Sequence, residues 1–264
     1  MPASSPPLPS VFVSHGAPTV ALGRGATQSF WTGLGGRLAG LEAILCVSAH
    51  WLTPHPVLGA AERPEAIHDF HGFPAPLYRL RYPAPGAPAL AESIAGRLRG
   101  AGFLVDTDAA HGLDHGAWVP LRFMFPEARV PVVQLSVQMH LGPRHHFELG
   151  RALAPLRSEG VLILGSGGAT HNLRDFAGQA EDAPVKSYAR QFDDWLAGRV
   201  EAGDAEALLD YAGQAPEARR NHPTPDHLLP LFVPLGAATP GRPGRVLHRG
   251  FSHGFLSLAA FEWD

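Results

Sequence analysis

The chain has 264 residues, of which 45% are hydrophobic, and a formal net charge of −3 at pH 7. This length suits one α/β domain, and a near-balanced charge without a run of Lys or Arg argues against nucleic acid and anionic membranes as partners. The single cysteine, Cys46, excludes an intramolecular disulfide and metal sites built from several thiolates.

The N-terminal composition bears on localisation. Residues 1–9 are rich in Ser and Pro and lack a basic region and an apolar core, so we expect a flexible arm and no signal peptide. No window reaches the apolar length of a transmembrane helix. Because no repeat or interdomain linker is visible, we expect residues 1–264 to form a single catalytic domain of a cytoplasmic protein.

Two early strands each lead to a histidine. An apolar run at 11–13 predicts a strand that leads to His15, and a second run at 43–47 leads to His50. Residues at the carboxyl ends of strands in an α/β sheet lie in the crevice where ligands bind. A lone histidine there is most simply a hydrogen-bonded core residue. Since both histidines occupy the same kind of position, shared metal ligation is an equal alternative.

The remaining pattern alternates between helices and strands. In chain order we predict a helix at 27–38, a strand at 56–61, a helix at 88–98, strands at 103–105 and 130–137, a helix at 143–156, a strand at 161–164, a helix at 185–200, and sheet-forming segments at 245–247 and 250–261. This alternation is typical of an α/β fold.

Two segments between these elements carry further candidates. The loop at 67–74 contains His68 and Asp69 among aromatic, Gly and Pro residues, as substrate-binding loops do, although a structural Asp–His hydrogen bond explains it equally well. Asp114 is a suitable N-cap for a short helix, and His115 would then project from its first turn or simply pack there.

The strand at 161–164 leads into a glycine-rich loop that ends at His171. The loop lacks the Gly-Lys-Ser/Thr of a phosphate-binding loop, the third glycine of a dinucleotide motif and the Gly-x-Ser-x-Gly of a nucleophile elbow. The loop places a histidine after the end of the strand, so we regard His171 as a candidate acid/base residue.

The segment after residue 221 places one more histidine. Thr224 and Pro225 predict a helix start, which would put His227 in the first turn, while Pro230 and Pro234 predict a kinked or short helix. With His15, His50, His171 and His227 all at element ends, and His115 nearby, the residues indicate a mononuclear histidine-rich site for zinc or Fe(II).

Seven short stretches are distinctive, and all but one of them contain a histidine. They are Ser14-His15-Gly16-Ala17-Pro18, Ser48-Ala49-His50-Trp51, Ile67-His68-Asp69-Phe70, Tyr82-Pro83-Ala84-Pro85-Gly86, Asp114-His115-Gly116-Ala117-Trp118, His171-Asn172-Leu173 and Pro223-Thr224-Pro225-Asp226-His227. In these stretches, which run from about residue 12 to 235, the sequence resembles the class III extradiol ring-cleavage dioxygenases of the DOPA 4,5-dioxygenase type.

The resemblance implies an α/β fold with a central mixed, mainly parallel sheet flanked by helices. It also implies a mononuclear nonhaem Fe(II) held by His15, His50 and His227, a site that Zn²⁺ can occupy in purified protein. Three neutral imidazoles leave the charge of the metal uncompensated, which suits a catechol bound as an anion. The implied partners are a small-molecule catechol and O2, with no nucleic acid and no membrane.

The resemblance further implies the roles of the remaining candidates. His171 matches the acid/base residue of the family, and His115 matches a second histidine of the pocket. His68, Asp69 and Tyr78 are candidate substrate-binding residues. The implied product is a ring-opened semialdehyde.

Two other functions fit the same residues. A zinc-dependent hydrolase would use His171 as a base beside zinc-bound water, and a non-catalytic metal-binding protein could keep the fold alone. An acid/base histidine beside the ligands argues against a pure scaffold. The sequence leaves the physiological catechol, the position of ring cleavage and the oligomeric state undetermined.

Overall fold

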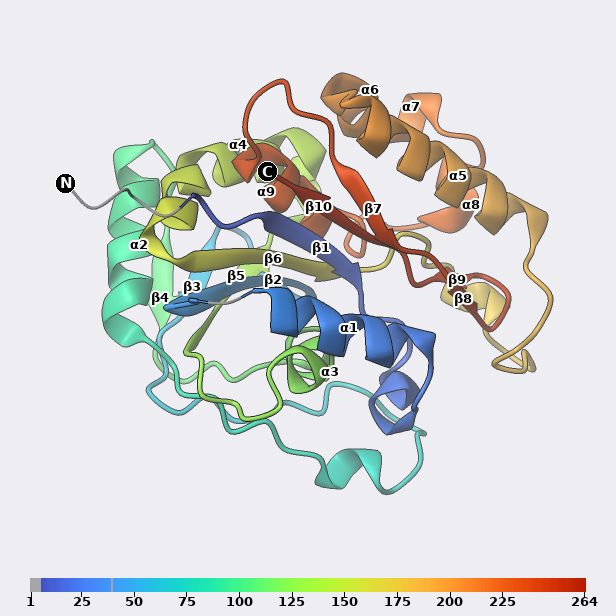
Figure 1. Ribbon diagram of the computed structural model, residues 1–264, viewed down its shortest axis with the longest axis horizontal. Coiled ribbons are helices and arrows are strands. Elements are labelled where there is room, and N and C mark those ends of the chain that lie inside the picture. The colour runs from blue at the N-terminus through green and yellow to red at the C-terminus, as the bar shows by residue number, and fades with distance from the viewer. Residues whose placement is uncertain (1–5, 39) are drawn as a thin grey trace.

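The apolar runs of the sequence form the central strands of one mixed sheet (Figure 1). The computed structural model describes residues 6–38 and 40–264, so residues 1–5 of the expected N-terminal arm lie outside the described residues. Within the described part of that arm, the Leu8 N–H donates to the carbonyl of Arg157 at 3.0 Å. No helix in the described ranges is long and apolar enough to cross a membrane.

The sheet has eight strands in the order β4-β3-β5-β2-β6-β1-β10-β7. They are β1 (Ser10–Ser14), β2 (Ala43–Leu52), β3 (Val57–Gly59), β4 (Asp106–Asp108), β5 (Val132–Val137), β6 (Val161–Gly167), β7 (Arg245–His248) and β10 (Ala260–Trp263). The central strands β5, β2, β6 and β1 are parallel, whereas β10 is antiparallel to β1 and β7, and β3 to β5. The prediction of an α/β fold around a mixed, mainly parallel sheet is therefore confirmed.

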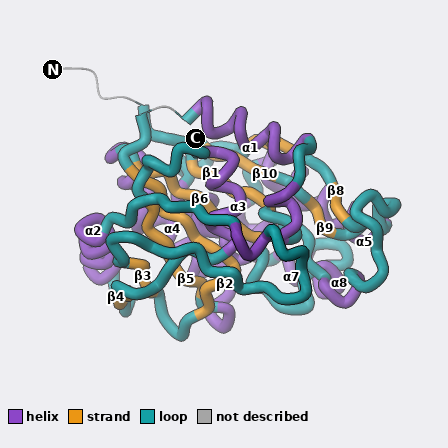
Figure 2. The backbone as a smooth tube through the Cα atoms, turned by 90° about the horizontal axis from the view of Figure 1, so that it is seen from below, coloured by secondary structure: helices purple, strands orange, loops and turns teal. Residues whose placement is uncertain are grey.

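Helices cover both faces of the sheet (Figure 1). One face packs against α1 (Ala26–Arg37) and α3 (His115–Met124), and the other against α2 (Pro88–Gly100), α4 (Gly142–Leu153), α5 (Ser187–Ala202) and α9 (Leu229–Ala237). The shorter elements are α6 (Ala205–Leu209), α7 (Tyr211–Gln214), α8 (Ala218–Asn221), the strands β8 (Phe251–Ser252) and β9 (Leu256–Ser257), and the 3-10 helices η1 (Pro18–Leu22), η2 (Leu77–Arg79), η3 (Met139–Leu141), η4 (Ala154–Glu159) and η5 (Leu173–Asp175). Long loops cross the face that carries α1 and α3 (Figure 2).

Glycines in β6 allow the segment before α9 to pack directly on the sheet. A Cβ at Gly167 would overlap with the carbonyl oxygen of His227, and one at Gly165 with that of Pro230. The Gly168 N–H donates to the His227 carbonyl at 2.8 Å. This close approach brings residue 227 to the carboxyl end of β6, where a larger residue would hold it away.

Several boundaries differ from the sequence prediction, and the sheet-forming segment expected at 250–261 divides into β8, β9 and the start of β10. The segment 103–105 is not a strand: the Phe103 N–H caps α2 by donating to the carbonyl of Leu98 at 3.0 Å, and β4 begins only at Asp106. Strand β2 continues through His50 to Leu52, so this histidine lies within the strand, where pairing with β5 becomes irregular.

A further difference concerns the helix that was expected to begin near residue 224. Helix α9 begins at Leu229, so Thr224 is not its N-cap and His227 precedes the helix. Pro230 lies in the first turn, where the missing N–H has no helical partner to lose. The expectation of a short helix is confirmed.

Candidate metal centre and active site

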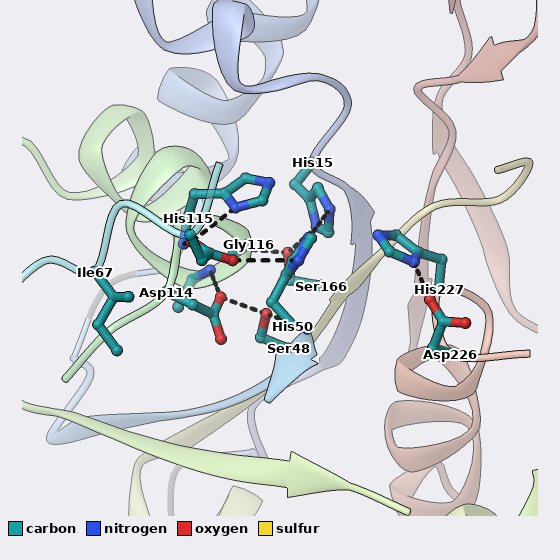
Figure 3. Close-up of polar contacts among 12 residues, drawn as sticks. His15, Ser48, His50, Ile67, Asp114, His115, Gly116, Ser166, Asp226 and His227 are labelled. Carbon is teal, nitrogen blue, oxygen red and sulfur yellow. Dashed lines mark hydrogen bonds and ion pairs between the residues drawn. The ribbon is translucent and has the colours of Figure 1, made fainter. Parts of the chain in front are cut away.

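Six histidines line one cavity at the carboxyl ends of the parallel strands, and Figure 3 shows four of them, His15, His50, His115 and His227. The cavity has a volume of about 500 Å³, and the histidines are His15, His50, His71, His115, His171 and His227. A larger depression of about 740 Å³, beside Arg63 and Arg81, contains none of them. His71 comes from the loop at 67–74, whereas the other five come from segments that the sequence placed at element ends, and the fold brings them together.

His15 follows β1 directly and is oriented by β6. Its Nδ1 lies 3.1 Å from Ser166 Oγ, and that hydroxyl donates to the carbonyl of Gly116 at 2.5 Å (Figure 3). Because the hydroxyl proton is used there, the oxygen accepts from Nδ1–H of His15. The hydrogen-bond network therefore assigns the lone pair of His15 to Nε2, which faces the cavity.

His50 and His227 have the same arrangement, each with a carboxylate as partner. His50 Nδ1 lies 3.2 Å from Asp69 Oδ2, and Nδ1 of His227 donates to the carboxylate of the preceding Asp226. The Nε2 of His227 is buried and has no hydrogen-bond partner among the described residues. In each ring the Nδ1 proton is engaged, so Nε2 is left as an acceptor.

These three nitrogens converge on a common point. Each of the three residues offers one nitrogen within 4.8 Å of the others, and the Nε2 atoms of His15 and His50 are 3.1 Å apart. Two nitrogens bound at about 2.1 Å to one ion lie roughly 3.0–3.5 Å apart, depending on the ligand angle. Facing lone pairs at this distance repel each other unless a cation lies between them, so the residues fit a bound metal ion.

Burial keeps these ligands neutral. It lowers the pKa of His15 and of His227 well below the ordinary value, helped by the neighbouring histidines. Burial and the neighbouring His115 lower the pKa of His50 to about 4, against the opposing effect of nearby carboxylates. Neutral imidazole is the form that binds a metal, so the ligand set needs no deprotonation near neutral pH.

A single carboxylate joins His50 to a fourth histidine. Asp69 Oδ1 accepts from Nδ1–H of His115 at 2.9 Å and from its backbone N–H at 3.0 Å, while Oδ2 faces His50. Burial opposes ionisation of Asp69, but the hydrogen bonds and charge of His115 and the proximity of His50 outweigh it and lower its pKa to about 2. Asp69 thus pairs with histidines from other segments rather than from its own loop, and its contact with His115 leaves Nε2 of that ring available to the cavity.

Replacing Asp69 by Asn should weaken the site without unfolding the protein. The amide keeps the size of the side chain but loses the charge and one acceptor, so His50 and His115 can no longer both be held in the same tautomer. We expect metal affinity or turnover to fall roughly 10–100-fold. Metal titration followed by activity assays on the loaded variant would measure both, and unchanged values would show that Asp69 does not orient these rings.

His171 is placed differently from the four histidines described above. Its ring stacks on that of His227, with centroids 3.3 Å apart and planes 5° from parallel. Among residues 6–38 and 40–264 no protein group hydrogen-bonds its ring nitrogens, and its backbone N–H donates to Asn221. Burial, reinforced by His222, lowers the pKa of His171 to about 3, so the ring is neutral at pH 7.

The other two candidates from the sequence, His68 and Tyr78, lie outside the cavity lining. His68 Nε2 contacts the carbonyl of Leu80 at 3.1 Å, and the hydroxyl of Tyr78 accepts from the Phe73 N–H at 3.3 Å. Both rings pack against Phe70 and are absent from the cavity lining, whereas Asp69 belongs to it. Any influence of His68 and Tyr78 on substrate would therefore pass through Phe70.

Sequence reasoning missed several residues that shape the site. Ser166 and Asp226 orient two of the candidate ligands, and Phe73, Leu173 and Phe176 line the cavity. The position of Asp226 directly before His227 could have indicated its role. No comparable signal marks Ser166 or the apolar residues, because their partners come from distant parts of the chain.

Comparison with known proteins agrees with this site. Residues 10–259 match the family described as the catalytic LigB subunit of aromatic ring-opening dioxygenase. The chain therefore belongs to the LigB family of ring-opening dioxygenases. Enzymes of this family are metal-dependent, in keeping with the histidine cluster.

Relatives at higher similarity narrow the activity. The chain is 42% identical to the 4,5-DOPA dioxygenase extradiol of Beta vulgaris (96% of this chain, 95% of the relative) and 37% identical to the protein of that name from Escherichia coli strain K12 (98% and 96%). Its fold matches the crystal structure of the uncharacterized protein JW3007 from Escherichia coli K12, with a TM-score of 0.81 and 33% identity over 97% of this chain and 100% of that one.

These similarities decide between the three functions that the sequence left open. The protein is an extradiol dioxygenase, as its family and these relatives are named, rather than a zinc hydrolase or a non-catalytic binding protein.

Proposed function

We propose that this protein is a mononuclear Fe(II)-dependent extradiol dioxygenase that cleaves a ring-substituted, DOPA-like catechol with O2 to a semialdehyde, with residues 1–264 acting as one catalytic domain. The proposal depends on one observation above all. His15, His50 and His227 each offer one nitrogen within 4.8 Å of the others, while the Nδ1 of each ring has a hydrogen-bond or ion-pair partner elsewhere.

In this proposal those three histidines hold the metal. Bound Fe(II) would supply exchangeable positions for substrate and O2 together with the redox activity that Zn²⁺ lacks. The protein supplies a neutral ligand set inside a buried cavity, so negative charge is favoured on the substrate. A catechol ionised at its hydroxyl groups meets this requirement.

The protonation steps fall to His171 and His115. His171 lies beside the proposed ligand His227, and its ring nitrogens have no hydrogen-bond partner among the described residues, so it is placed to take a proton from a catechol hydroxyl and return it to a reacting oxygen. The Nε2 of His115 is an acceptor on another side of the cavity, because Asp69 holds its Nδ1 proton. His115 therefore orients the second hydroxyl group or dioxygen.

Metal exchange tests the proposal. We expect protein stripped of metal and reloaded anaerobically with Fe(II) to consume O2 in proportion to added catechol, DOPA, protocatechuate or caffeate and to form a yellow product. The Zn²⁺-loaded protein should bind a catechol but consume no O2. Equal uptake by both forms, or none by the iron form at confirmed occupancy, would contradict the proposed metal.

A further inference from the structure

One polar side chain of the cavity has no task in the site described above. His71 lines the cavity from the loop between β3 and α2, and it is exposed. We propose that His71 binds the carboxylate at the end of the ring substituent of a DOPA-like catechol, and so gives the enzyme a preference for substrates that carry this group. This inference rests on the function proposed above.

The other polar side chains of the lining are engaged elsewhere. Three are the proposed metal ligands, and His171 stacks on one of them. Asp69 divides its two carboxylate oxygens between His115 and His50. In the part of the chain that the structure describes, the ring of His71 makes no hydrogen bond or ion pair. This imidazole is therefore the polar side chain of the lining that remains available to a substituent on the substrate ring.

A carboxylate on the substituent needs such a partner. Among the described residues that line this cavity there is no Arg or Lys. Arg63 and Arg81 line the separate depression, and Lys186 pairs with Asp175 at 3.1 Å. Removing a carboxylate from water without a partner is costly, whereas an imidazole ring can donate a hydrogen bond to it and, when protonated, also supplies a positive charge.

The loop that carries His71 is held on both sides of this residue. On one side, the Phe70 ring packs edge-on against the ring of His115, with centroids 5.5 Å apart. On the other side, the Phe73 N–H donates to the Tyr78 hydroxyl at 3.3 Å, and the Phe73 ring packs edge-on against that of Phe70 at 5.5 Å. These contacts fix residue 71 relative to the histidine that orients the substrate.

The position of the catechol hydroxyls directs the substituent toward the opening of the cavity. The hydroxyls lie at the buried histidines in the proposed function, so a substituent on the far side of the ring extends toward solvent. His71 is exposed and lines the same cavity, which places it at this opening together with the apolar side chains of Leu173 and Phe176. The apolar residues can cover the ring and its alkyl chain, which leaves the carboxylate to His71.

DOPA and its methyl ester test this role on the iron-loaded enzyme, because they share the ring and the amino group and differ in the carboxylate. We expect kcat/KM of the unmodified enzyme for DOPA to exceed that for the ester at least about fivefold, mainly through a lower KM. In His71→Ala the ratio should fall to near one, while kcat for both substrates and KM for the ester change little. Equal values in the unmodified enzyme, an unchanged ratio in His71→Ala, or an equal loss for both substrates would overturn the inference.

A second variant tests whether position 71 acts through its charge and hydrogen bond. A guanidinium keeps both, so His71→Arg should retain the preference for DOPA. If the ratio fell in His71→Arg as far as in His71→Ala, the inference would be overturned.

Arg174 provides a matched control near the cavity. It follows the lining residue Leu173 but does not itself belong to the lining, so Arg174→Ala should leave the ratio unaltered. A fall of the ratio in Arg174→Ala, with none in His71→Ala, would assign the carboxylate to Arg174 and overturn the inference.

Unsubstituted catechol separates this inference from the proposed function. If the iron-loaded enzyme cleaves catechol and DOPA while His71→Ala leaves the ratio unchanged, only the role of His71 fails. If neither catechol nor any substituted form is cleaved at confirmed iron occupancy, the proposed function fails with it.

Discussion

Replacing His227 by alanine is expected to abolish metal binding and to lower kcat/KM on the order of a thousandfold or more, which corresponds to about 4 kcal/mol of transition-state stabilisation. The reason is the position of its ring, whose Nε2 is buried without a partner among the described residues and which offers a nitrogen within 4.8 Å of nitrogens of His15 and His50. Metal content by mass spectrometry and oxygen uptake at saturating Fe(II) would measure the two effects. His15→Ala and His50→Ala should behave alike.

A histidine outside the cavity provides the control. His140 is exposed on η3, so His140→Ala removes the same group without touching the site and should retain both metal and activity. If His227→Ala bound iron as tightly as the unmodified protein, the assignment of the three ligands would be wrong.

Replacing His171 is expected to separate chemistry from metal binding. Because the ring stacks on His227 and is not assigned as a ligand, His171→Ala should bind Fe(II) normally and lose roughly 10²–10⁴-fold in kcat. His171→Phe separates the two properties better than His171→Ala does, because it keeps a flat ring against His227 and removes the ring nitrogens. Iron titration and single-turnover kinetics would distinguish the two properties.

Two results would contradict this role. Loss of iron in His171→Phe would make His171 a ligand or a support for one. Unaltered turnover in that variant would transfer the acid/base role to His115, whose Nδ1 is held by Asp69.

The strands and the histidines after them were predictable because their signals are local. The apolar runs at 11–13, 43–47 and 161–164 each became a parallel strand, and the rule that ligands bind at the carboxyl ends of such strands placed His15, His50 and His171 correctly in one cavity. Asp114 was likewise recognised as a helix cap, and its side chain accepts from the Ala117 N–H at 3.1 Å.

What could not be predicted depends on contacts between distant segments. Nothing near His15 in the sequence indicates that Ser166 fixes its tautomer, because the two meet only through the pairing of β1 with β6. The start of α9 was misplaced for a related reason. Packing against the glycines of β6 and two prolines determine where that helix begins, and these outweigh the capping preference of Thr224.

The fate of dioxygen tests the central claim most directly. Iron-loaded enzyme would be given a catechol under isotopically labelled O2. The aldehyde of the product would be reduced at once with borohydride, because its oxygen otherwise exchanges with water. The mass of the reduced product would then be measured by mass spectrometry. Extradiol cleavage predicts a ring-opened product that carries both labelled atoms. A product with one labelled atom, or an intact ring with none, would contradict the account.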